Sequence, residues 1–184
     1  MLVVNLFGGP GVGKSTLAAQ VYAELSKKGY AVEYVSEFAK DLIWSDCERL
    51  LQDQFLVAAQ QHHRINRLKG KVDVVVTDSP SLLGIVYRHL WNDDKYSSVL
   101  DDLIWEVHTM YSRVNFVIPR CHQFSDNGRL HNEQQSQQVD NDIIALLNQR
   151  SQEQQYTTYL DVDSDWVATV LQRTCATLGR LKRP

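Results

Sequence analysis

A glycine-rich stretch near the start of the chain has the residue types and spacing of a phosphate-binding loop. Residues 8–16 read GGPGVGKST and match the pattern G-x-x-x-x-G-K-[ST], whose glycines let backbone N–H groups converge on phosphate oxygens. We expect the lysine to reach the β and γ phosphates of a nucleotide and the serine hydroxyl to be a Mg²⁺ ligand. The alternative is a glycine-rich turn with an exposed lysine. The predicted nucleotide-binding residues are Gly8, Gly9, Pro10, Gly11, Val12, Gly13, Lys14, Ser15 and Thr16.

Two carboxylates follow strand-like segments. Asp78 ends the apolar run in VVVTDSP, at the position where P-loop proteins hold the metal directly or through water. It could instead only cap the next helix. Glu37, in VSEFAKDL, ends an earlier strand-like segment, and ligands in open α/β sheets gather at the carboxyl ends of strands. We expect Glu37 to accept the proton of an attacking hydroxyl; an exposed residue with no role is the alternative.

A long polar segment carries arginines that could meet the charge of a transferring phosphoryl group. Residues 119–135 are predicted to form a loop that closes over the site as a lid, because loops of this length are usually functional. Arg120 and Arg129 are the predicted catalytic arginines, and Arg113 lies nearby in the sequence. Arginines on a closing loop can stabilise the transferred group while excluding water. Solvation without a role is the alternative for each of them.

Aromatic and basic residues near the predicted strand ends are candidates for acceptor binding. Aromatic rings there could stack on a base, although core packing is the alternative for each one. An acceptor within DNA would also require a basic rim, for which Lys40, Arg64, Arg67 and Arg88 are candidates. The predicted substrate-contacting residues are Phe38, Lys40, Trp44, Tyr87 and Arg88.

The elements that must position these residues alternate between strands and helices. This alternation predicts an α/β fold with a parallel sheet, as one domain over residues 1–184. The predicted strands cover residues 2–7, 31–36, 72–80, 114–118 and 157–162. The predicted helices cover residues 14–28, 45–69, 82–112 with an interruption at 91–98, 140–149 and 166–178.

Composition excludes several classes of protein. A net charge of −3 does not suit a protein that binds nucleic acid along its whole surface. The 3 cysteines form no Cys-x-x-Cys pair, which disfavours a disulfide framework or a zinc site. The adjacent His62 and His63 point in different directions on a helix, so they do not suggest a metal site. No signal peptide or membrane-spanning run is visible, and we expect a cytoplasmic protein.

Together these motifs resemble the P-loop kinases of the ribosylnicotinamide-kinase type, within the broader nucleotide kinase group. The segments GGPGVGKST, SEFAKDL, VVVTDSP and FSDNGR follow the order of that family's phosphate loop, Glu-aromatic stretch, Asp-containing third strand and lid. The resemblance covers about residues 1–162. It implies a five-stranded parallel sheet in the order 2-3-1-4-5. This chain departs from the family at Lys40, where the family has arginine, and at Asn127, which alters the lid spacing.

Within this group the chain looks most like small kinases encoded by bacteriophages. Some of those phosphorylate the hydroxymethyl group of 5-hydroxymethyluracil in viral DNA, as a step in base modification. The resemblance therefore implies an ATP- and Mg²⁺-dependent kinase acting on such DNA in the host cytoplasm. A free nucleoside, a nucleoside monophosphate or ribosylnicotinamide is the alternative acceptor.

Other nucleotide-binding functions fit less well. A regulatory GTPase is disfavoured because the Asn-Lys-x-Asp motif is absent. A motor ATPase is disfavoured because the chain is short and no glutamate follows Asp78. A binding module that holds ATP without transferring phosphate is a further alternative.

Overall fold

The computed structural model describes residues 1–91, 97–121 and 132–181. Its centre is a five-stranded sheet in the order β2-β3-β1-β4-β5, with every neighbouring pair parallel. The predicted fold class and strand order are confirmed. The strands are β1 (Leu2–Phe7), β2 (Val32–Val35), β3 (Val74–Thr77), β4 (Ser112–Val117) and β5 (Thr157–Tyr159).

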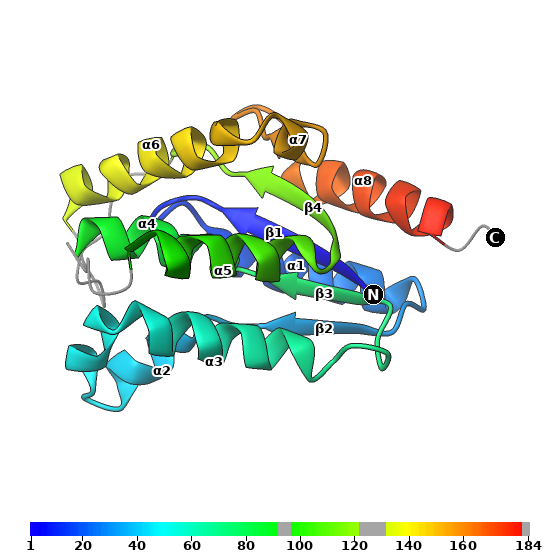
Figure 1. Cartoon of the computed structure of the whole chain (residues 1–184). Coiled ribbons are helices and arrows are strands. Elements are labelled where there is room, and N and C mark those ends of the chain that lie inside the picture. The colour runs from blue at the N-terminus through cyan, green and yellow to red at the C-terminus, as the bar shows by residue number, and fades with distance from the viewer. Residues whose placement is uncertain (92–96, 122–131, 182–184) are drawn as a thin grey trace.

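Helices cover both faces of the sheet (Figure 1). One face packs against α1 and α8, and the other lies under α3, α4, α5 and α6. The α-helices are α1 (Lys14–Lys27), α2 (Phe38–Trp44), α3 (Gln54–Asn66), α4 (Leu83–Leu90), α5 (Ser97–Thr109), α6 (Glu133–Gln149), α7 (Ser151–Gln154) and α8 (Trp166–Leu181), with the 3₁₀ helix η1 (Glu48–Gln52) between α2 and α3.

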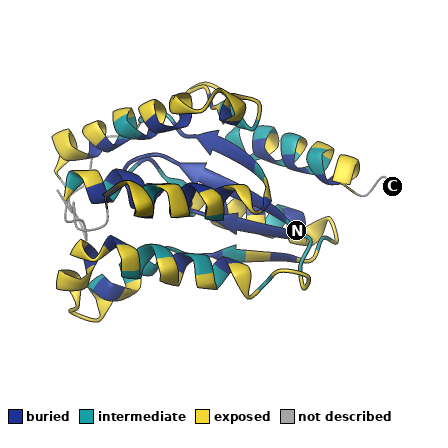
Figure 2. Cartoon of the chain, viewed as in Figure 1, coloured by how far each residue is buried: buried dark blue, intermediate teal, exposed yellow. Residues whose placement is uncertain are grey.

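The central strand β1 shows why the chain forms three layers. Successive side chains of a strand point to opposite faces. Leu2, Val4 and Leu6 join the core beneath α1 and α8, while Val3 packs beside Ile65 of α3 on the opposite face. The strands are buried and the outer helix faces are exposed (Figure 2). A strand buried on both faces has a continuous apolar sequence, as this one does.

The prediction of one helix over residues 45–69 is wrong. The chain breaks there between α2, η1 and α3. Ser45 is the C-cap of α2, and Asp46 has a φ of 53°, in the left-handed region that ends a helix. The cap of α3 is Asp53, whose side chain accepts a hydrogen bond from the Leu56 N–H at 3.0 Å. Helix α3 therefore begins at Gln54 rather than at residue 45.

Helix α6 begins earlier than predicted and takes over the end of the predicted lid. Asn132 is its N-cap and forms a capping box with Gln135, whose backbone N–H donates to the Asn132 side chain at 2.8 Å. A lid within residues 119–135 therefore ends at the start of this helix. The glutamine-rich sequence gave no indication that the helix begins at Glu133.

The described part of the chain contains no helix that combines the length and apolar character needed to cross a membrane.

Candidate active site

The predicted phosphate loop joins β1 to α1. Gly11 and Gly13 have φ values of 93° and 94°, which residues with a side chain rarely adopt. Gly13 is also the N-cap of α1, and as a glycine it has no side chain to bond to the first N–H groups of that helix. These N–H groups and the positive end of the helix dipole form an anion site. This geometry is compatible with phosphate binding, which stays a prediction from the sequence.

The Lys14 side chain folds back over the phosphate loop. Its Nζ donates to the carbonyl oxygens of Gly8 at 2.6 Å and Gly9 at 3.0 Å. Burial lowers the pKa of Lys14, while the nearby carboxylates of Glu37 and Asp78 oppose that shift. The ammonium is thus held among groups of opposite charge beside the loop.

Ser15, Tyr34, Lys40 and Asp78 form a cluster beside the phosphate loop. The Asp78 Oδ2 accepts hydrogen bonds from the Ser15 hydroxyl at 2.5 Å and the Tyr34 hydroxyl at 2.8 Å. Lys40 Nζ donates to Ser15 Oγ at 2.6 Å and lies 3.4 Å from Asp78 Oδ2. The alternative that Asp78 merely caps the next helix is not supported, because the N-cap of α4 is Leu82.

This cluster fits a Mg²⁺ ion. Hydroxyl and carboxylate oxygens are the ligands that Mg²⁺ prefers. Asp78 is 1% exposed, and its Oδ1 is buried without a hydrogen-bond partner in the described residues. Ser15 and Asp78 would hold the ion, and the Lys40 ammonium supplies positive charge to the same oxygens. Among the described residues, no group of three or more His, Cys, Asp or Glu side chains suggests another metal site.

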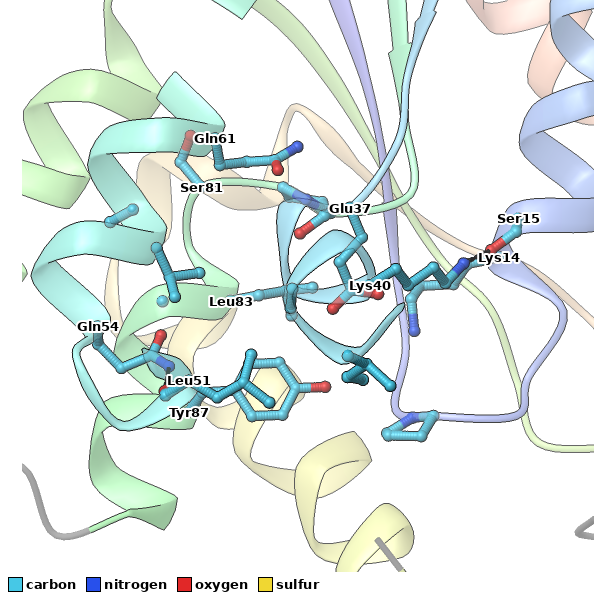
Figure 3. Close-up of a pocket in the computed structure, with 18 of the residues that line it drawn as sticks. Lys14, Ser15, Glu37, Lys40, Leu51, Gln54, Gln61, Ser81, Leu83 and Tyr87 are labelled. Carbon is cyan, nitrogen blue, oxygen red and sulfur yellow. Dashed lines mark hydrogen bonds between the residues drawn. The ribbon is translucent and has the colours of Figure 1, made fainter. Parts of the chain in front are cut away.

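Glu37 lines a cavity whose wall also includes Lys14 and Ser15 of the phosphate loop. It is the N-cap residue of α2, yet its side chain makes no capping hydrogen bond. The carboxylate instead points into the cavity, on the side where Lys14 and Lys40 approach it (Figure 3). Burial raises the pKa of Glu37, whereas the Lys14 charge lowers it. A carboxylate with a raised pKa beside a phosphate loop is suited to accept a proton.

The cavity has a volume of about 380 Å³. One end is the phosphate loop with Lys14 and Ser15, and the other lies between α3 and α4, near Gln54 and Tyr87 (Figure 3). Its walls come from the segments after β2 and β3. The wall residues beyond the phosphate loop are Glu37, Ala39, Lys40, Ile43, Leu51, Gln54, Val57, Ala58, Gln61, Ser79, Pro80, Ser81, Leu83, Gly84, Tyr87 and Trp91.

Arg120 is the only one of the two predicted lid arginines within the described residues. Its guanidinium donates to Asp140 of α6 at 2.8 Å and to the Pro10 carbonyl oxygen of the phosphate loop at 3.1 Å. The same Asp140 accepts from the Gly9 N–H at 2.5 Å. Arg120 therefore sits against the phosphate loop and ties it to α6. Arg129, with Asn127, lies outside the described residues.

Other predicted substrate residues do not all reach the cavity. Lys40 and Tyr87 line it, whereas Phe38, Trp44 and Arg88 do not. The Phe38 ring lies under the Arg64 guanidinium at 5.0 Å, and the Trp44 side chain is 83% exposed. Arg88 is buried and donates to Asp101 at 2.5 and 2.9 Å. The sequence could not foresee this pair, because Asp101 is on another helix.

The predicted basic rim is largely neutralised by carboxylates of the chain itself. Arg64 forms an ion pair with Asp41, and Arg88 is buried beside Asp101. Lys40 is engaged by Ser15 and Asp78. Arg67 is exposed. This arrangement is not the one that the DNA-acceptor hypothesis predicted.

Three site residues were missed in the sequence. Tyr34 is an alternating residue of β2, Asp140 lies in a polar helix, and Gln54 follows the cap of α3. None of them belongs to a motif. Burial raises the pKa of Tyr34, and the Asp78 charge adds to the shift. Only the strand alternation could have indicated that Tyr34 faces a different side from Val35.

Comparison with known proteins agrees with this geometry. Residues 3–161 match a family model described as an AAA domain. The chain belongs to this AAA domain family. A search of curated proteins found no relative of the chain.

Solved structures show that the AAA domain of this chain has a fold found elsewhere. The structure of NadR protein in complex with NR is similar, with a TM-score of 0.71 and 16% sequence identity. The match covers 97% of this chain and 50% of the NadR chain, so this chain spans about half of that protein's length. The structure of APE1195 has a TM-score of 0.45 and 18% identity, covering 99% of this chain and 96% of that chain. The first likeness establishes the fold alone, a P-loop α/β fold with a five-stranded parallel sheet.

Proposed function

We propose that the protein is an ATP- and Mg²⁺-dependent phosphotransferase that moves the γ-phosphate to a hydroxyl group of a nucleoside-sized acceptor. The observation that carries this proposal is the position of Glu37. Its carboxylate, with a raised pKa, faces the cavity beside Lys14 and Ser15 of the phosphate loop. An ATPase, or a module that only binds ATP, transfers no phosphate to an acceptor and so needs no acceptor cavity beside this carboxylate.

The reaction follows from the arrangement of these side chains. The acceptor hydroxyl oxygen forms a bond to the γ phosphorus, and the bond from that phosphorus to the β–γ bridging oxygen breaks, releasing ADP. The hydroxyl proton passes to the Glu37 carboxylate. Lys14 and the loop N–H groups hold the phosphates and stabilise the charge that moves to ADP. Mg²⁺ held by Ser15 and Asp78 would neutralise phosphate charge.

Arg120 and the predicted lid complete this proposal. Arg120 already contacts the phosphate loop through the Pro10 carbonyl oxygen. From there it could stabilise the transferred group, and Arg129 is predicted to act on the same group. Both assignments remain predictions from the sequence.

The cavity favours a free small molecule as acceptor. A volume of about 380 Å³ falls in the usual range for small-molecule sites. Most of the predicted basic rim is neutralised. The NadR protein of similar fold was solved with NR, and a nucleoside, a nucleoside monophosphate or ribosylnicotinamide is the acceptor class we favour.

The hydroxymethyl group of 5-hydroxymethyluracil in phage DNA is the second candidate. Trp44 is 83% exposed and follows the wall residue Ile43, so its ring could stack on a base near the cavity. An extruded base could then enter the cavity with its hydroxymethyl group toward Glu37.

The test is transfer of γ-labelled phosphate from ATP to a panel of acceptors. The panel contains free nucleosides, nucleoside monophosphates, ribosylnicotinamide, 5-hydroxymethyluracil DNA and unmodified DNA. Label on a free small molecule supports our preferred acceptor, and label confined to the modified DNA supports the second. A reaction without acceptor measures ATP hydrolysis alone.

Two outcomes would contradict the proposal. Tight ATP binding with no label on any acceptor would favour a binding module. Release of phosphate from ATP without any acceptor, at a rate that no acceptor increases, would favour an ATPase. An Ala58→Leu variant sharpens the test, because it should block the cavity and abolish transfer while ATP affinity stays within about twofold.

A further inference from the structure

Two glutamines of α3, two turns apart, extend toward the cavity but differ in their hydrogen bonding. Gln61 is satisfied: its Oε1 accepts from the Phe38 N–H at 3.0 Å, and its Nε2 lies 3.4 Å from the oxygens of Ser36 and Thr77. Gln61 therefore fixes the start of α2. Gln54, although only 3% exposed, has a buried Oε1 with no hydrogen-bond partner in the described residues.

The orientation of the Gln54 amide is fixed by its neighbour. Its Nε2 lies 2.6 Å from the Leu51 carbonyl oxygen. A carbonyl oxygen at that distance requires a donor, so the atom there must be the amide nitrogen. The opposite orientation would place two acceptors in contact. The free atom is thus an acceptor, at the end of the cavity away from the phosphate loop (Figure 3).

The surrounding wall offers this oxygen little compensation. The neighbouring cavity residues include Leu51, Val57, Ala58 and Leu83, whose side chains are apolar. A buried acceptor without a partner has lost its hydrogen bonds to water and gained none in return, which is unfavourable. A ligand that brings an N–H group to this point would recover that cost.

We propose that Gln54 determines specificity by accepting a hydrogen bond from an N–H group on the ring system of the acceptor. This inference rests on the proposed function for its reaction, but the binding that it describes can be measured alone. Exocyclic amino groups also carry such donors, but the two that we propose are the lactam N–H of a pyrimidine and the carboxamide N–H on a ring. The reacting hydroxyl would lie at the other end of the molecule, near Glu37.

The experiment compares pairs of ligands that differ in that donor. Uridine and 3-methyluridine test the lactam, and ribosylnicotinamide and its carboxylic acid analogue test the carboxamide. Binding is measured by calorimetry with ADP and Mg²⁺ present, and phosphotransfer is measured separately. We expect the N–H member of one pair to bind about 10- to 100-fold more tightly, since a site built for a hydrogen bond rejects a ligand that lacks it.

Variants link this preference to Gln54. Gln54→Leu keeps a similar volume, and it should reduce the ratio within the preferred pair to about twofold or less. Gln60→Leu on the exposed side of the same helix is the matched control and should keep the full ratio. Thermal unfolding of each variant shows whether it is folded. The preference of the unmodified protein needs no variant, so the proposal is testable even if Gln54→Leu does not fold.

The outcomes separate this inference from the proposed function. Equal binding of both members of each pair, with phosphate still transferred to a nucleoside, overturns the role of Gln54 alone. A clear N–H preference lost in Gln54→Leu, with no transfer to any acceptor, supports Gln54 and overturns the phosphotransferase. A ratio unchanged by Gln54→Leu also overturns the inference, because another group must then read the ligand.

Discussion

Glu37 and Glu153 lie in different surroundings, and their pKa values are shifted in opposite directions. Glu37 follows β2 and faces the cavity, and burial raises its pKa. Glu153 of α7, which is 2% exposed, accepts from His108 at 3.2 Å, from the Arg113 Nε at 3.1 Å and from Asn115 at 3.1 Å. Burial also raises the pKa of Glu153, but the hydrogen bonds and charges of His108 and Arg113 outweigh this effect and lower the pKa to about 2.

The difference lies in what surrounds each carboxylate. Glu153 has donors from α5 and β4, and its cluster extends through Asn115 to Asn5 of β1 at 3.0 Å. Such a fully bonded buried charge holds elements together. Glu37 has nearby charges but keeps a raised pKa, which suits a group that must exchange a proton. The comparison predicts that changing Glu37 affects chemistry and changing Glu153 affects stability.

The largest expected effect is on phosphotransfer in Glu37→Gln. Loss of the base should lower kcat by about 10²- to 10⁴-fold, while ATP affinity and thermal stability change little. The measurement is labelled transfer to the best acceptor together with ATP binding by calorimetry. Glu33→Gln, at an exposed position of β2, is the control and should react normally. Normal turnover in Glu37→Gln would show that another group takes the proton.

The next effect is on stability in Glu153→Gln. This change leaves the Arg113 guanidinium, 10% exposed at its side chain, without its charge partner. Breaking a buried ion pair costs about 3–5 kcal/mol, and we expect a loss near 3 kcal/mol because Gln can still accept hydrogen bonds. Urea unfolding measures it, with exposed Glu106→Gln as control. Reduced kcat in the folded variant, with unchanged stability, would contradict the assignment.

Acidity should separate the two glutamates further. Glu37 must be deprotonated to act, and its pKa is above the ordinary 4.5, so kcat/KM should fall on acidification at a pH above 4.5. Glu153 has a lowered pKa, so its stabilising effect is present above 4.5 and is lost as the pH falls from 4.5 towards about 2. The stability gap between unmodified protein and Glu153→Gln should therefore narrow only below pH 4.5, after activity has begun to fall. If the stability gap narrowed at a higher pH than the fall in activity, the contrast drawn between the two glutamates would be wrong.

The sequence predicted the site and missed the Glu153 cluster for a physical reason. Phosphate binding needs a fixed local pattern, so residues 8–16 predict it without knowledge of the fold. Glu37 and Asp78 were found because parallel strands end at one edge of the sheet. The cluster instead joins Glu153, in the polar segment SQEQQ, to Arg113 near the start of β4. Nothing local marks either residue as buried.

The same limit explains the errors within the site. Arg113 was grouped with the lid arginines by proximity in sequence, but it binds Glu153 and lies over the Tyr156 ring at 4.3 Å. Lys40 was predicted to contact the acceptor, and it does line the cavity, but its ion pair was not foreseen. Its partner Asp78 comes from another strand, so only the assembled sheet brings the two together.

The smallest expected effect concerns Lys40, whose ammonium acts beside the predicted metal ligands. Its side chain is 44% exposed, whereas that of Asp78 is 1% exposed. Without Mg²⁺, Lys40→Met should lower the free energy of unfolding by about 1 kcal/mol, a value reduced for solvent screening. With Mg²⁺ and ADP the deficit should shrink, because the ion then supplies positive charge to Asp78. Thermal unfolding with and without both ligands measures this, and exposed Lys71→Met is the control. A deficit that persists unchanged with both ligands would mean that Lys40 and the metal do not act on the same oxygens.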